Sequence, residues 1–108
     1  MSDARARYRE GFQHFASGRL SEAIACYRQA LERDPGLAIA WNALSMALQR
    51  SGDLEGAIEA GRRLVELEPD DPLSHTNLSI LYQSKGMIQE AEDEMAVASR
   101  LQSPGGGG

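Results

Sequence analysis

Apolar residues recur along the chain with the period of an α-helix, in stretches separated by short polar or glycine-containing segments. In the middle of the chain, Trp41, Leu44 and Leu48 are three and four residues apart, and residues 55–67 repeat the pattern. Such spacing places apolar side chains on one face of a helix. The pattern predicts an all-α fold with six helices, near residues 4–17, 21–33, 38–50, 55–67, 72–84 and 89–101.

Small and helix-ending residues recur every 34 residues, which indicates an internal repeat. Glycine is expected where the first helix of each pair ends, because a left-handed backbone costs glycine little. Alanine is expected where two helices cross, opposite another small residue, and proline where the second helix ends. The residues concerned are Gly18, Gly52 and Gly86; Ala23, Ala57 and Ala91, opposite Gly11, Ser45 and Ser79; and Pro35 and Pro69.

The repeated unit resembles the tetratricopeptide repeat, a helix-turn-helix of 34 residues. The resemblance implies a right-handed α-solenoid of three such units, at residues 4–37, 38–71 and 72–103, with six antiparallel helices. Residues 104–108 are expected to form a flexible glycine-rich tail. The resemblance rests on Gly11, Gly18, Ala23, Tyr27, Ala30 and Pro35 in the first unit; Trp41, Leu44, Ser45, Leu48, Gly52, Ala57 and Pro69 in the second; and Leu78, Ser79, Tyr82, Gly86, Ala91 and Ala98 in the third.

Charge and composition narrow the class of partner. The net charge of −5 argues against nucleic acid, because phosphate binding needs a concentrated basic surface. The charge is uneven, since the first unit sums to +2, the second to −4 and the third to −2. No apolar run approaches the roughly 20 residues of a membrane-spanning helix, and the single Cys26 indicates no internal disulfide. We therefore expect a soluble, cytoplasmic protein that binds neither nucleic acid nor membranes.

No residue pattern indicates catalysis, a cofactor or a metal site. His14 and His75 belong to different units, and no carboxylate or cysteine stands at metal-ligand spacing around them. His75 takes the repeat position of Trp41, which predicts a packing role. The acidic run from Glu90 to Glu94 opens the last predicted helix, where negative charge suits the helix dipole. We expect a protein that is not an enzyme.

The tetratricopeptide resemblance implies that the first helix of each pair lines a concave groove where ligands bind. Each of these helices has a second, partly apolar stripe beside the one used for packing, with Phe12, Met46 and Ile80 expected along the groove floor. Phe15 and Ile39 are equally compatible with packing against the neighbouring inner helix. The candidate site comprises Tyr8, Phe12, Phe15, Ile39, Asn42, Met46, Gln49, Leu73, Thr76, Asn77, Ile80 and Gln83.

The first hypothesis for function is a protein-interaction module that binds a peptide or an amphipathic helix in this groove. Chaperone-binding members of the family hold an acidic C-terminal peptide with Lys, Asn and Arg side chains. Four of the five matching positions have lost the required polar group and none is a cation, so binding of chaperone tails is not expected. The matching positions are Tyr8, Phe12, Ala43, Leu73 and Asn77.

Two further hypotheses remain open. One is a self-associating scaffold in which protomers stack end to end, suggested by the positive first unit, the negative later units and the residual apolar pair Met95 and Leu101. The other is a non-catalytic domain of a larger protein.

Overall fold

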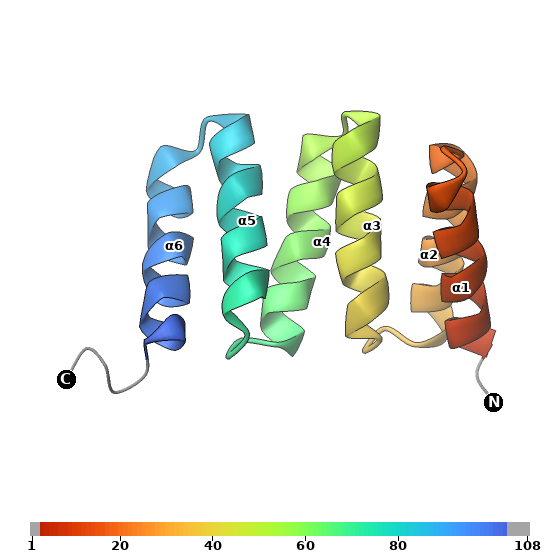
Figure 1. The fold of residues 1–108 in the computed structure, drawn as a ribbon, viewed down its shortest axis with the longest axis horizontal. Coiled ribbons are helices and arrows are strands. Elements are labelled where there is room, and N and C mark those ends of the chain that lie inside the picture. Colours follow the sequence, from red (N-terminus) through yellow and green to blue (C-terminus); the bar gives the residue numbers. More distant parts are fainter. Residues whose placement is uncertain (1–2, 104–108) are drawn as a thin grey trace.

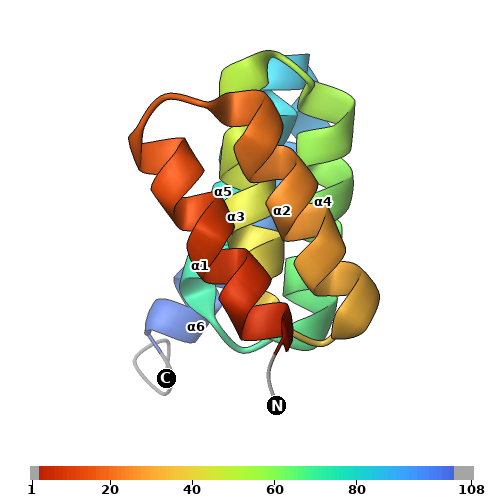
Figure 2. The ribbon, with the colours of Figure 1, turned by 90° about the vertical axis from the view of Figure 1, so that its right-hand side faces the viewer.

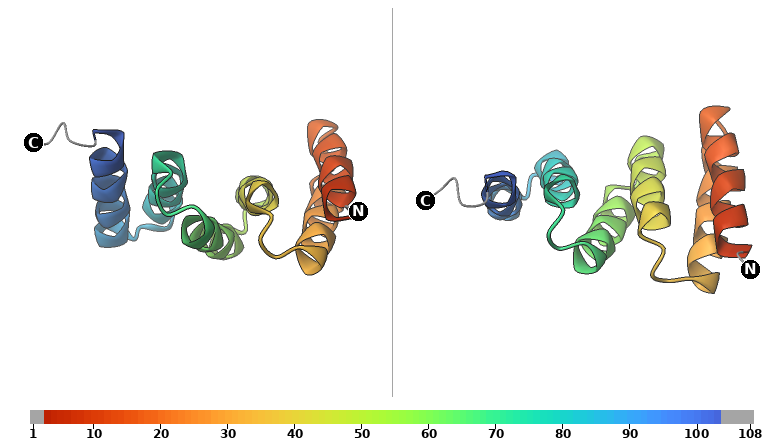
Figure 3. Two further views of the ribbon diagram at one scale, coloured as in Figure 1. Left: turned by 90° about the horizontal axis from the view of Figure 1, so that it is seen from below. Right: turned by 60° about the horizontal axis from the view of Figure 1, so that its bottom comes forward.

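The computed structural model describes residues 3–103, which form six α-helices and no strand. The helices are α1 (Asp3–Ala16), α2 (Leu20–Arg33), α3 (Ala38–Ser51), α4 (Leu54–Leu67), α5 (Pro72–Lys85) and α6 (Ile88–Gln102). They stand in a row, with α1 and α6 at opposite ends (Figures 1 and 3). The predicted all-α fold is confirmed, and every helix end lies within one residue of its expected position. The expected tail at 104–108 lies outside the described residues, and the unit boundaries stay a prediction.

Glycine closes the first helix of each pair. Gly18, Gly52 and Gly86 have φ angles of 80°, 93° and 84°, in the left-handed region where a side chain would introduce strain. The amide groups of Gly52 and Gly86 donate to carbonyls in the last turns of α3 and α5, so the helix ends are satisfied by hydrogen bonds. The predicted role of these glycines is confirmed.

Aspartate side chains cap the N-terminal ends of α4 and α5. Asp53 Oδ1 accepts a hydrogen bond of 2.9 Å from the amide of Gly56, at the start of α4. Asp71 Oδ1 accepts one of 3.0 Å from the amide of Leu73, and Pro72 is the first residue of α5. Each carboxylate satisfies an amide of the first turn that has no partner inside its helix.

Small residues let the two helices of each pair approach closely. Ser45 Oγ donates to the carbonyl of Ala57 over 3.0 Å, and Ser79 makes the equivalent bond in the third pair. In the first pair, a Cβ atom on Gly11 would lie 2.6 Å from the ring of Tyr27. The small residues are therefore required by the distance between the helices, as the repeat predicted.

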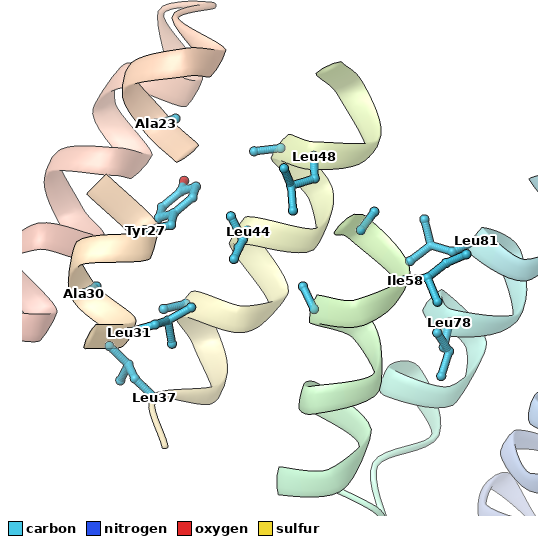
Figure 4. Close-up of a cluster of buried hydrophobic side chains, with 14 of the residues drawn as sticks. Ala23, Tyr27, Ala30, Leu31, Leu37, Leu44, Leu48, Ile58, Leu78 and Leu81 are labelled. Atoms are coloured by element: carbon cyan, nitrogen blue, oxygen red, sulfur yellow. The ribbon is translucent and has the colours of Figure 1, made fainter. Parts of the chain in front are cut away.

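Buried apolar side chains join successive pairs into one core. Figure 4 shows Tyr27 and Leu31 of α2 lying toward α3, and Leu78 and Leu81 of α5 beside α4. Helix α1 also contacts α3 directly. We call α1, α3 and α5 the first layer and α2, α4 and α6 the second layer. Figure 2 shows α1 on one side of the molecule and α2 and α4 on the other. Each first-layer helix keeps one face uncovered.

Candidate functional site

Five large apolar side chains remain exposed on the first layer. Phe12, Ile39, Met46, Leu73 and Ile80 have exposed fractions between 44% and 62%. Three of them, Phe12, Met46 and Ile80, occupy one repeat position on three successive first-layer helices. We call these five side chains the first-layer surface. Exposed apolar residues gathered on one face are typical of an interaction site.

Two aromatic residues of the candidate site are half-buried beneath this surface. Tyr8 stacks on Tyr27, with 5.9 Å between the ring centroids, and its ring lies 6.4 Å from that of Phe12. Phe15 packs against the core, and the guanidinium carbon of Arg50 lies 4.9 Å from its ring centroid. Phe15 thus takes the packing role that the sequence left open for it, whereas Ile39 stays 46% exposed.

The polar side chains of the candidate site differ in exposure and in whether they already have a hydrogen-bond partner. The hydroxyl of Thr76 donates to the carbonyl of Pro72 over 3.0 Å, so it is already satisfied within α5. Asn42 is half-buried, and its amide nitrogen lies 4.0 Å from the sulfur of Met46. The remaining amides are exposed on the first layer: Gln49, Asn77 and Gln83.

A hollow of about 300 Å³ lies between α3 and α5. Ile39 and Leu73 line it together with Asn42 and Asn77, and Asp71 is also among its lining residues. The structure therefore brings together candidate residues from two units, with apolar walls and amide groups in one place. Such a mixture is common in sites that bind peptides.

Three exposed arginines on the first layer were missed by the sequence reasoning. Arg5 takes the repeat position of Ile39, Arg9 lies one turn before Phe12, and Arg50 contacts α1 as described above. None of the three forms an ion pair within residues 3–103. The 34-residue register would have found them, because it places each beside a residue already chosen.

The second layer has a hollow of its own, between α2 and α4. It has a volume of about 380 Å³, and Trp41, Leu44 and Leu48 of α3 line it together with the charged Arg28 and Glu59. Trp41 is half-buried, and its Nε1 donates to the carbonyl of Pro35 over 2.7 Å.

His75 on α5 takes the repeat position that Trp41 holds on α3, and its side chain is buried. Its Nδ1 lies 2.7 Å from Glu94 Oε1 and its Nε2 lies 2.7 Å from the carbonyl of Pro69. A carbonyl and an ionised carboxylate only accept, and a neutral imidazole donates from one nitrogen alone, so with Glu94 ionised both hydrogen bonds form only when the ring is protonated. The buried position of His75 agrees with the predicted packing role, and the sequence did not identify Glu94 as its partner. Glu94 serves this contact as well as the helix dipole.

Burial works to lower the pKa of His75, because it penalises the charged ring. The hydrogen bonds that the ring donates to Glu94 and to the carbonyl of Pro69, with the charges of Glu94 and Asp71, outweigh burial and raise the pKa of His75 above 6.5. No group of three or more His, Cys, Asp or Glu within residues 3–103 is arranged to hold a metal. His75 and Glu94 form a polar contact between α5 and α6.

A family model described as "Tetratricopeptide repeat" matches residues 8–72, which is more than half of the chain. This chain belongs to the tetratricopeptide repeat family. The fold predicted from the 34-residue register is thus confirmed by the helices and by the family match. Within residues 3–103, no helix combines the length and the apolar character that crossing a membrane requires.

Among curated tetratricopeptide relatives, the chain is 31% identical over 88 residues to the peroxisomal targeting signal receptor of Kluyveromyces lactis, covering 82% of this chain and 16% of that protein. It is 28% identical over 102 residues to the photosystem I assembly protein Ycf3 of Cyanophora paradoxa, covering 92% and 59%. The chain thus spans about one-sixth of the length of the receptors that it matches.

Solved structures share the tetratricopeptide fold over most of this chain. The crystal structure of MamA superposes with a TM-score of 0.89 at 23% identity, covering 94% of this chain and 59% of that one. The second tetratricopeptide domain of Spaghetti (RPAP3), bound to the HSP90 peptide SRMEEVD, has a TM-score of 0.84 at 19% identity and covers 92% of both chains. At these identities the likeness concerns the fold alone.

Proposed function

We propose that this tetratricopeptide module binds a peptide or an amphipathic helix of a partner protein on its first-layer surface. The observation that carries this proposal is the row of Phe12, Met46 and Ile80, one exposed apolar side chain on each first-layer helix. Isolated exposed apolar residues need no explanation, but a row across three helices is the arrangement that a binding surface requires. The Spaghetti domain, which has the same fold, is bound to a peptide.

The apolar row would supply most of the affinity, because contact with a partner removes it from water. The amides of Gln49, Asn77 and Gln83 are placed to hydrogen-bond a partner backbone, which fixes its position. Met46 at the centre has a flexible side chain that adapts to partners of different shape. The surface is therefore suited to several related segments.

The test is selection from a displayed library of random peptides of about 16 residues, which span roughly four helical turns. We expect wild-type protein to enrich peptides that the variant Phe12→Glu with Met46→Glu no longer binds, because two carboxylates would have to be desolvated. The matched control is Leu67→Glu with Ile88→Glu, two similarly exposed apolar positions on the second layer. Far-UV circular dichroism should show unchanged helicity in both variants. Equal binding by wild type and the first variant would exclude the first-layer surface as the site.

Chaperone tails are a class of peptide that we do not expect here. The clamp positions hold Tyr8, Phe12, Ala43, Leu73 and Asn77, which place no cation to receive a terminal carboxylate. The peptide SRMEEVD, measured by fluorescence anisotropy, is the direct probe. Micromolar affinity that is lost when the C-terminal carboxylate of the peptide is amidated would contradict the absence of a carboxylate clamp.

A self-associating scaffold is the alternative function, and one observation favours it. Ile88 and Met95 on α6 are 55% and 37% exposed, so the last helix keeps an apolar face open beside the acidic residues. Light-scattering mass after size exclusion, at two salt levels, separates the two functions. A monomer near 11.7 kDa would leave the first-layer surface free for a partner, whereas a salt-sensitive oligomer would favour the scaffold.

This chain covers only 15–16% of the receptors that it matches. That small share supports the further hypothesis that the chain is a non-catalytic domain of a larger protein. In either setting we propose that the module acts by binding and not by catalysis, and that neither nucleic acid nor a membrane is its partner. The net charge of −5 supports the exclusion of nucleic acid. A cytoplasmic location stays a prediction.

A further inference from the structure

Charge is distributed by layer and not only by unit. Helices α1, α3 and α5 together carry five basic and two acidic residues, whereas α2, α4 and α6 carry five basic and nine acidic residues. The first layer is therefore net positive in a protein whose total charge is −5. Summing by repeat unit hides this difference, because each unit contributes one helix to each layer.

The acids of the first layer are already paired. Both lie on α1, where Glu10 bonds Arg7 over 2.7 Å and Asp3 bonds Arg33 over 3.1 Å. Helices α3 and α5 contain no acidic residue. The charge that remains available on this layer is therefore cationic.

The available cations are Arg5, Arg9 and Arg50, which lie toward the α1–α3 half of the first layer. All three are exposed, and Arg50 reaches across from α3 to the ring of Phe15 on α1. The far half of the layer differs, because Lys85 is paired with Glu55 over 3.1 Å. The hollow between α3 and α5 also has acidic lining residues, Glu68 and Asp71.

We propose that the partner segment is acidic as well as apolar, and that its carboxylates lie over the α1–α3 half of the surface. This inference rests on the proposed function. Apolar side chains of the segment would contact Phe12 and Met46, while Asp or Glu beside them would pair with Arg5, Arg9 and Arg50. Glu68 and Asp71 would repel an acidic stretch placed over the other half, so the charges also set the direction of the segment.

A segment of another protein fits this surface better than a second copy of the chain does. Helix α6 is acidic, but it exposes only two large apolar side chains, Ile88 and Met95, against the five of the first-layer surface. A second copy would satisfy the charges and leave most of the apolar row uncovered. We therefore assign the site to a heterologous acidic, apolar segment.

The experiment uses the peptides that the library selection enriches on wild-type protein and that Phe12→Glu with Met46→Glu fails to bind. We expect these peptides to carry net negative charge, with acids interspersed among apolar residues. Their affinities are then measured by fluorescence anisotropy against the triple variant Arg5→Gln, Arg9→Gln, Arg50→Gln. The matched control is Arg28→Gln, Arg63→Gln, Arg100→Gln, which removes one exposed arginine from each second-layer helix and changes the net charge equally.

The first triple variant should lose about tenfold in affinity and the control about twofold or less, since each exposed charge pair contributes a few tenths to one kcal/mol. The wild-type affinity should also fall as salt rises. Neutral or basic peptides, or equal losses in both triple variants, would overturn the inference and leave the proposed function intact. No variant-sensitive peptide at all would overturn the proposed function itself. Self-association abolished by Phe12→Glu with Met46→Glu would show a second copy to be the occupant.

Discussion

The spaces between second-layer helices are built differently at the two ends of the molecule. Between α2 and α4 lies an open hollow of about 380 Å³ beside Trp41. Between α4 and α6, 34 residues later, the equivalent residue is the buried His75, paired with Glu94. Glu94 takes the position that Ala60 holds in the first space, so a single exchange of alanine for glutamate accompanies the exchange of Trp for His.

A second pair of equivalent residues shows the same difference. Leu48 lines the first space, whereas its counterpart Tyr82 accepts a hydrogen bond of 2.8 Å from Arg62 Nε, and the Arg62 guanidinium lies 5.7 Å from the Tyr82 ring centroid. The same helix arrangement therefore has Trp and Leu side chains in the first space, and His–Glu and Arg–Tyr contacts at the equivalent positions of the second. We call these two sets of side chains the first junction and the second junction. The lesson is that the repeat fixes the backbone while the junction chemistry is free to vary.

The largest effect is expected from Trp41→Ala. Truncation removes the ring that joins α3 to its neighbours and the hydrogen bond to Pro35, so we expect a loss of about 3 kcal/mol in the free energy of unfolding, the low end for Trp because the ring is half-buried. Urea unfolding followed by circular dichroism measures it. The variant Trp41→His keeps a ring and should lose less. A loss below about 1 kcal/mol for Trp41→Ala would mean that the first junction does not depend on this residue.

A smaller effect is expected from Glu94→Gln at pH 6. The change leaves the buried imidazolium of His75 without its carboxylate, so we expect a loss of about 2 kcal/mol, the usual range for a hydrogen bond between charged groups. Glu92→Gln, at an exposed position on the same helix, is the control and should be nearly neutral. Equal stability of the two variants would show that the second junction does not rely on the ion pair.

The pH dependence of stability tests the same junction without changing its shape. The pKa of His75 is raised in the folded protein, so its contribution is fully present below the unfolded value near 6.5. The contribution is lost as the pH rises through the folded pKa. Wild-type stability attributable to His75 should therefore fall as the pH rises above about 6.5, and the variant His75→Trp, which copies the first junction, should lack this component. Parallel pH profiles for the two proteins would contradict the assignment.

The smallest effect is expected from Tyr82→Phe. It removes only the hydroxyl that accepts from Arg62, and because Arg62 is exposed we expect a loss of about 0.5–1 kcal/mol. Thermal unfolding is the measurement, with Tyr27→Phe as the comparison at an aromatic residue that has no such cation beside it. A loss above about 2 kcal/mol would show that the contact contributes more to the second junction than one hydrogen bond does.

The sequence by itself determined the fold, because the features that define it are local or strictly periodic. Gly18, Gly52 and Gly86 end helices through their own backbone conformation, and the small residues at the crossings recur at a fixed spacing. The packing position of His75 and the exposure of Phe12 also followed from the register. For such features, neighbours along the chain supply most of the physical constraint.

Only the tertiary structure decided which side chains meet between helices. Glu94 lies 19 residues from His75 in the chain, and its distance of 2.7 Å depends on how α5 and α6 pack. The basic character of the first layer likewise emerges only when alternate helices are grouped, and Arg50 finds Phe15 across the α1–α3 contact. Side-chain pairing and surface charge depend on short distances in space, which a repeat spacing along the chain does not specify.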